Sequence, residues 1–167
     1  MLTILGILLN KLLREGSNMP GIRDMLNEIR RVLPEGETVP FQTLARPADF
    51  TAKRQGNEVI FTIKGKKDKP NDVTIDFAEF QEVLCLLRQK TDGVEFGNIQ
   101  KYVIGHANCT VNTIDGHIAH FFYGIPKGGT HTRRATYIAP VLSRAELIKH
   151  HKGSGPQKIS LNGKKIE

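Results

Sequence analysis

The sequence predicts a small α+β protein in which a helix and a β-hairpin precede a mainly helical half. Segments 22–32, 77–87 and 110–121 repeat apolar residues every three or four positions, as amphipathic helices do. Shorter runs rich in valine, isoleucine and threonine are typical of strands. A chain of 167 residues, 39% hydrophobic and 25% charged, is long enough to bury a core without disulfides.

The first 19 residues form a leucine-rich segment of their own. We expect an amphipathic helical leader that packs on the core or on a second copy, giving a homodimer. Neither a charged start nor a small-residue cleavage site accompanies it, which argues against a signal peptide, and it is too short to span a bilayer. Met19 is an alternative start. The leucines at helical spacing are Leu5, Leu8, Leu9, Leu12 and Leu13.

Residues 20–75 are expected to form a small module of one helix and a hairpin. In its helix, Ile22, Met25, Ile29 and Val32 share one face, and Pro20 suits the first turn. The composition then predicts strands. They are placed at 39–44, 58–64 and 73–75, and the last two form a hairpin across a basic loop at 64–69.

A second helix is expected to begin after Asp76. Asp76 and Glu79 have the spacing of a capping box, in which each side chain accepts a hydrogen bond from a free amide at the helix start. Its apolar stripe is Phe77, Phe80, Leu84 and Leu87, supported by Val83. Thr91-Asp92-Gly93 ends this helix, and 94–96 is expected to be a short strand.

The next segment has the pattern of two helices joined by a tight turn. We expect a short helix at 97–104, a turn at Gly105, and a helix at 110–121 capped by Asn108 or Thr110. The apolar face of the second helix is Val111, Ile114, Ile118 and Phe121. Its opposite face is Asn112, Thr113, Gly116, His117 and His120.

A hairpin and a last helix are predicted to follow. Strands at 121–125 and 134–138 flank a glycine-rich loop, and a helix at 144–151 opens on Ser143 and Glu146. The basic side chains of the hairpin tip are Lys127, His131, Arg133 and Arg134. Residues 152–167 form a basic tail, in which 159–166 either makes a hairpin over Asn162-Gly163 or stays mobile.

Residues 76–140 resemble the winged helix-turn-helix superfamily of DNA-binding domains, although the resemblance identifies no family within it. It is carried by the string TVNTIDGHIAHF, with Thr110 and Val111 opening the helix and His117-Ile118 one turn further on. The resemblance implies a winged helix-turn-helix domain at 76–151, with helix 110–121 in the major groove and the wing on the phosphates.

The positive charge is concentrated in the last quarter of the chain. The formal net charge is +7, and residues 127–167 hold nine lysines and arginines against two glutamates, while the rest of the chain is balanced. Such asymmetry favours a polyanionic partner. A membrane-surface role is disfavoured, because this segment is poor in large apolar residues that insert into lipid.

These patterns predict a protein that binds double-stranded DNA, either as a transcriptional regulator or as the recognition part of a restriction or defence system. Since the expected recognition face lacks Arg and Lys and carries Asp115, the wing and tail would supply most of the affinity. The expected DNA contacts are Asn108, Thr110, Asn112, Thr113, His117, His120, Lys127, His131, Arg133 and Arg134. The alternatives are a protein–protein interaction module and an RNA-binding protein.

No enzymatic activity, cofactor or metal is predicted. His106, Cys109, His117 and His120 have a spacer that is short for a zinc finger. Pro47-Ala48-Asp49 resembles part of a metal-dependent nuclease site, but strand 58–64 lacks the second carboxylate. With two cysteines, the chain is expected in a reducing cytoplasm, associated with the nucleoid.

Overall fold

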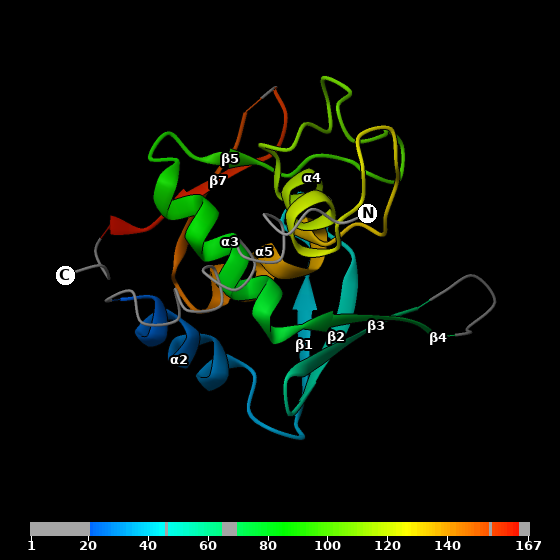
Figure 1. The fold of residues 1–167 in the computed structure, drawn as a ribbon. Coiled ribbons are helices and arrows are strands. Elements are labelled where there is room, and N and C mark those ends of the chain that lie inside the picture. Colours follow the sequence, from blue (N-terminus) through cyan, green and yellow to red (C-terminus); the bar gives the residue numbers. More distant parts are fainter. Residues whose placement is uncertain (1–20, 46, 65–69, 154, 164–167) are drawn as a thin grey trace.

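In the computed structural model, residues 21–45, 47–64, 70–153 and 155–163 are described, and their mixture of helices and two antiparallel sheets confirms the α+β class (Figure 1). The expected leader, and the dimer contact assigned to it, lie outside these residues. None of the described helices is long and apolar enough to cross a membrane.

The first sheet is a four-stranded antiparallel meander in the order β1-β2-β3-β4. Its strands are β1 (Thr38–Gln42), β2 (Asp49–Gln55), β3 (Glu58–Lys64) and β4 (Pro70–Asp76). The predicted hairpin of β3 and β4 is confirmed, and β2 is an addition to the prediction. Because successive side chains alternate between faces, Phe41, Phe50, Phe61 and Ile75 share the buried face.

Two predicted helices are confirmed as α2 (Ile22–Val32) and α3 (Phe77–Gln89). The apolar residues of α2 fall on one face, and Ile22 and Ile29 are fully buried. At the start of α3 the predicted capping box is present. The Asp76 carboxylate accepts from the Ala78 amide at 2.8 Å, and the Glu79 carboxylate accepts from the Asp76 amide at 3.0 Å.

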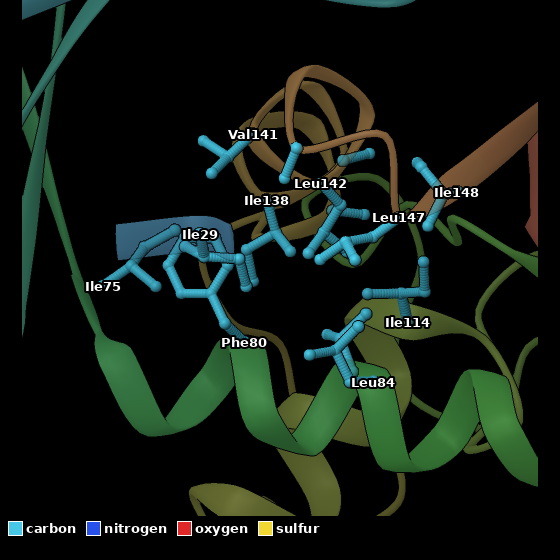
Figure 2. Close-up of a cluster of buried hydrophobic side chains, with 14 of the residues drawn as sticks. Ile29, Ile75, Phe80, Leu84, Ile114, Ile138, Val141, Leu142, Leu147 and Ile148 are labelled. Atoms are coloured by element: carbon cyan, nitrogen blue, oxygen red, sulfur yellow. The ribbon is translucent and has the colours of Figure 1, made fainter. Parts of the chain in front are cut away.

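A helix that was not predicted, α5 (Ala135–Arg144), lies at the centre of the core. Figure 2 shows its residues Ile138 and Leu142 facing Phe80 and Leu84 of α3. Its other side packs on the first sheet, where Tyr137 contacts the rings of Phe50 and Phe61. The expected strand at 134–138 is therefore wrong, because this segment buries residues at helical spacing.

The expected helix at 144–151 is also wrong. Helix α5 ends there, with Glu146 in the left-handed conformation (φ 58°) and the Leu147 amide donating to the Leu142 carbonyl at 3.0 Å. This pattern terminates helices. The chain continues as β6 (Ile148–His151).

The second sheet joins distant parts of the chain. It has the order β5-β7-β6, with β5 at Val94–Glu95 and β7 at Lys158–Leu161. The central strand, β7, comes from the expected basic tail and buries Ile159 against the core. One hydrophobic cluster extends from Ile22 to Ile159, so the core draws on both expected modules.

The segment between β5 and α5 differs most from the prediction. Residues 97–104 form turns in place of a helix, and the expected helix 110–121 is reduced to α4 (Ile114–His117) continued by the π-helical turn η3 (Ile118–Phe122). Neither 121–125 nor 134–138 is a strand, so the expected wing hairpin is wrong. These loops enclose a small cluster of Ile99, Ile104, Cys109 and Ala119.

Candidate functional site

The expected recognition face is largely inaccessible. Helix α4 begins at Thr113, whose hydroxyl accepts from the Gly116 amide at 3.2 Å, so neither Asn108 nor Thr110 is its cap. Thr113 is 4% exposed and Gly116 is buried against Thr110. Of the side chains expected to read bases from the start of this helix, Asn112 is exposed.

The two histidines of that face make internal contacts. His117 donates from Nε2 to the Glu82 carboxylate at 2.7 Å and lies beside the Phe121 ring. His120 donates from Nδ1 to the Ile125 carbonyl at 2.8 Å. Since both rings are half-buried and hydrogen-bonded to the protein, their expected role as DNA contacts is not supported by the geometry.

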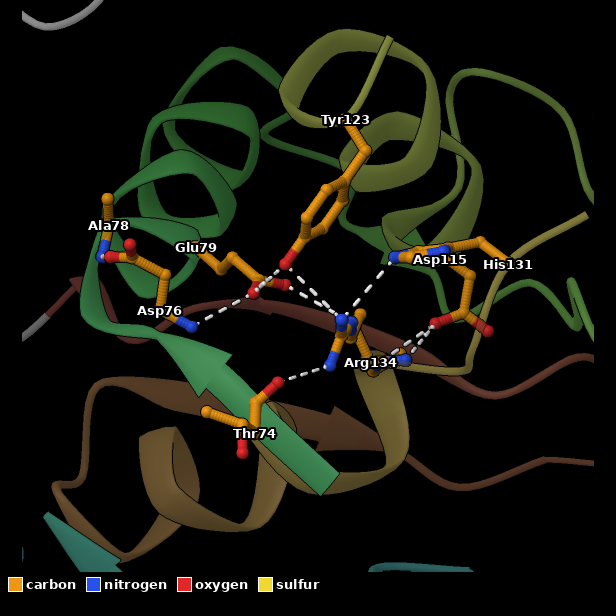
Figure 3. Close-up of polar contacts among 9 residues, drawn as sticks. Thr74, Asp76, Ala78, Glu79, Asp115, Tyr123, His131 and Arg134 are labelled. Carbon is orange, nitrogen blue, oxygen red and sulfur yellow. Dashed lines mark hydrogen bonds and ion pairs between the residues drawn. The ribbon is translucent and has the colours of Figure 1, made fainter. Parts of the chain in front are cut away.

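Arg134, expected on the wing, is instead the centre of a buried polar network (Figure 3). Its guanidinium donates to the Thr74 carbonyl at 2.7 Å and to the Tyr123 hydroxyl at 3.2 Å, and it lies 3.4 Å from the Glu79 carboxylate. It also donates to His131 Nε2 at 3.4 Å. The network ties α3 and β4 to the segment that enters α5, which is a structural role.

The network shifts the pKa values of its members. Burial raises the pKa of Glu79, although the hydrogen bond from Tyr123 and the charge of Arg134 oppose the shift. Burial and the neighbouring Glu79 raise the pKa of Tyr123, so its hydroxyl remains a donor, at 2.6 Å from Glu79. Burial and then the charge of Arg134 lower the pKa of His131, which favours a neutral ring that accepts from Arg134.

Asp115 caps the central helix. One of its carboxylate oxygens accepts from the amides of Arg134 and Ala135 at 2.9 and 2.8 Å, and the other lies 3.6 Å from Arg133 Nε. The side chain is fully buried, and burial raises its pKa against the opposing effect of those amides and of Arg133. Arg133 is thus also engaged with the protein interior.

The remaining predicted contacts lie on exposed loops. Lys127 is exposed beside Gly128, whose amide donates to the Ile104 carbonyl at 2.9 Å. Asn108 is exposed, and its amide donates to His106 Nδ1 at 3.1 Å. In the part of the chain that the structure describes, no group of three His, Cys, Asp or Glu side chains is placed to hold a metal ion.

A cleft of about 340 Å³ brings three predicted residues together with two lysines that were not predicted. Thr110, Asn112 and Thr113 line one wall, from the loop before α4. The other wall is formed by the end of α3 and by strands β5 and β7. Its polar residues are Lys90, Glu95 and Lys158. We call this hollow the Lys90–Lys158 cleft.

Gly93 positions one of these lysines. A Cβ atom at this residue would lie 2.7 Å from the Ile159 carbonyl oxygen and 3.0 Å from Cε of Lys158. The backbone also has φ +88°, which side-chain-bearing residues rarely adopt. The bare glycine therefore lets the Lys158 side chain lie across the backbone of this turn at the edge of the cleft.

The register of the second sheet extends this positive surface. In an antiparallel pair, residues directly opposite each other share a face. Lys158 lies opposite Glu95 and His151, and Ser160 lies opposite Lys149, so these side chains are on the face opposite to buried Ile159. We call Lys149, Lys158 and Lys90, together with the exposed Lys152 that follows the end of β6, the basic face.

Sequence reasoning missed these residues, although a signal was present. Lys149, Lys152 and Lys158 belong to the charge excess of the last quarter, in which Lys149 was expected on a helix and the other two in a tail. What could not be foreseen is that β7 pairs with β5 and so carries Lys158 to Lys90.

Comparisons of the chain with family models, with curated proteins and with solved structures found no match.

Proposed function

We propose that this protein binds double-stranded DNA through the basic face of its second sheet. The observation that carries the proposal is the register of β6 and β7, which turns Lys149 and Lys158 to one side, and Lys158 lines the same cleft as Lys90. Lysine ammonium groups neutralise phosphates and release counterions, which supplies most of the affinity of sequence-independent DNA binding.

The side chains around the basic face favour an anionic partner. Lys149 and Lys152 are exposed, and in the described residues neither forms an ion pair. The acidic residues nearest to these four lysines in sequence or register are Asp92, Glu95 and Glu146, so the surface keeps a net positive charge. The half-buried His150 is kept neutral, because burial and then Lys152 and His151 lower its pKa.

This proposal replaces the expected mode of binding. A winged helix-turn-helix would insert helix 110–121 into the major groove, but here the corresponding helix begins at Ile114 and its first residues are buried. We therefore propose that the contacts are to the phosphate backbone of the duplex. Transcriptional regulation and recognition in a restriction or defence system would both use such binding.

The test is a fluorescence-anisotropy titration of a labelled random-sequence duplex at about 50 and 200 mM salt. We expect affinity to fall steeply with salt, and the Lys149→Ala/Lys152→Ala variant to reduce the log–log salt slope by about 2. The control is Arg23→Ala/Lys53→Ala, which removes the same charge from α2 and β2 and should leave the slope unchanged.

Three outcomes would contradict the proposal. A weak salt dependence in the wild type would favour a protein-interaction module. An equal reduction of the salt slope in the control variant would mean that duplex binding depends on the net charge of the protein and not on the basic face. Better competition by structured RNA than by duplex DNA would favour an RNA-binding protein.

A further inference from the structure

We propose that the Lys90–Lys158 cleft binds a single nucleotide, with its phosphate between the two lysines and its base or sugar against Asn112, Thr110 and Glu95. The nucleotide is either a free nucleoside phosphate or a nucleotide displaced from DNA held on the basic face. The second source rests on the proposed function, and the first does not.

The two lysines are available for a phosphate. Glu95 lies directly opposite Lys158 in the sheet register, yet among the described residues neither forms an ion pair, and Lys90 forms none. Two ammonium groups facing one hollow repel each other, and a bound phosphate would relieve this repulsion. Gly93 supports the arrangement by allowing Lys158 to lie at the cleft edge.

The other wall offers neutral hydrogen-bonding groups. The exposed Asn112 amide, which makes no side-chain hydrogen bond in the described part of the chain, has a donor and an acceptor side by side and can pair with adenine N6 and N7. The Thr110 hydroxyl accepts from the Asn112 backbone amide at 3.2 Å, which leaves its proton to donate to a ligand. These groups favour a base or sugar over a second phosphate.

Glu95 makes the cleft unsuitable for a ligand that is anionic throughout. Its carboxylate lines the same hollow as the lysines and accepts hydrogen bonds only, so it favours an exocyclic amine or a sugar hydroxyl. The volume of about 340 Å³ is at the small end for organic ligands and limits the occupant to about one nucleotide. A nucleotide has a charged phosphate at one end and the hydrogen-bonding groups of its base at the other. This matches a cleft with lysines on one wall and Asn112 and Thr110 on the other.

Calorimetric titration of the full chain with adenosine 5′-monophosphate tests the site, with ribose 5-phosphate as a ligand of equal phosphate charge. We expect the nucleotide to bind more tightly than ribose 5-phosphate. Asn112→Ala should weaken nucleotide binding about tenfold, because it removes the paired contact to the base. Asn108→Ala is the matched control, since this asparagine is exposed on the same loop but does not line the cleft.

The source of the nucleotide is tested with two labelled duplexes, one fully paired and one with a single extrahelical adenosine. A preference for the bulged duplex that Asn112→Ala abolishes, with fully paired affinity unchanged, indicates a displaced nucleotide. Nucleotide binding without this preference indicates the free ligand. The Lys90→Ala variant, at the exposed end of α3, should weaken the binding of both adenosine 5′-monophosphate and ribose 5-phosphate. This substitution avoids the backbone strain that a replacement of Gly93 would cause.

The outcomes separate the two proposals. Salt-dependent duplex binding with equal affinity for both small ligands, no bulge preference and no effect of Asn112→Ala would overturn the nucleotide site and leave the proposed function standing. Nucleotide binding without any duplex binding would overturn the proposed function and leave the site.

Discussion

Replacing Asp115 with alanine removes the acceptor for two buried amides at the start of the central helix. The Arg134 and Ala135 amides donate to the same carboxylate oxygen at 2.9 and 2.8 Å, and Ala135 is fully buried, so water cannot easily take the place of that oxygen. An unsatisfied buried donor costs about 1–3 kcal/mol, which gives about 2–6 kcal/mol for the pair.

Two effects reduce this figure. The variant no longer buries a carboxylate, whose raised pKa shows that burial disfavours its charged form, and Arg133 can turn toward solvent because its side chain is 31% exposed. We therefore expect Asp115→Ala to lower the free energy of unfolding by about 3 kcal/mol, a large part of the roughly 5–15 kcal/mol typical of a domain.

Urea unfolding followed by circular dichroism at pH 7 measures this loss. With an m-value of about 2 kcal/mol/M, the midpoint should fall by about 1.5 M. Asp115→Asn keeps one carbonyl acceptor, so its free energy of unfolding should fall much less. Asp92→Ala, at an exposed aspartate, is the control and should change the free energy of unfolding by less than about 0.5 kcal/mol. If Asp115→Ala unfolds at the same urea concentration as the wild type, or if both Asp115 variants lose the same free energy of unfolding, the proposed capping role of Asp115 is refuted.

Two further predictions concern the same buried groups. Burial raises the pKa of Asp115 in the folded state above its ordinary value of 3.8, so the folded protein binds this proton more tightly than the unfolded chain does. The contribution of Asp115 to the free energy of unfolding therefore falls as the pH rises above 3.8. The stability of the wild type relative to Asp115→Asn should thus be higher at pH 4 than at pH 7 in chemical denaturation, and the opposite trend would contradict the assigned shift. Tyr123→Phe removes the donor 2.6 Å from Glu79 and an acceptor for Arg134, and should lower the free energy of unfolding by about 1–3 kcal/mol. An unchanged midpoint in urea would show that the network contributes nothing there.

The parts of the fold that were predicted from sequence are those set by local signals. Helix α3 has a complete capping box at Asp76 and a regular apolar stripe, and β3 is rich in β-branched and aromatic residues in the segment EVIFTIK. Strand β2 was missed because only Phe50 and Ala52 of its seven residues point fully inward among polar neighbours.

Helix α5 was misassigned because its local signals contradict its structure. Thr136, Tyr137 and Ile138 favour a strand, and Pro140 lies inside the helix, where it cannot donate a hydrogen bond. Burial on several sides and the cap from Asp115, which is distant in sequence, outweigh these preferences. The Ser143 and Glu146 spacing was misleading, because Glu146 ends a helix here instead of starting one.

In the candidate site, too, local sequence signals were informative and long-range contacts could not be predicted. Thr110, Asn112 and Thr113, which were expected as DNA contacts, line one cleft. Arg134 was wrongly placed on a surface, because no local pattern shows that Glu79 and Tyr123 receive it. Likewise Lys158 reaches Lys90 only through long-range strand pairing, to which sequence periodicity is insensitive.

The central position of β7 imposes an order on how the molecule is made. The strands of the first sheet all precede α3 and pair neighbour with neighbour, so this pairing can form while the ribosome is still translating the rest, whereas α5, which packs on the sheet and on α3, comes later. Strands β5 and β6 do not pair with each other and meet only through β7. The face that we propose for DNA is therefore absent from every nascent chain that stops short of Leu161, and truncated products would not compete with finished molecules for the same sites.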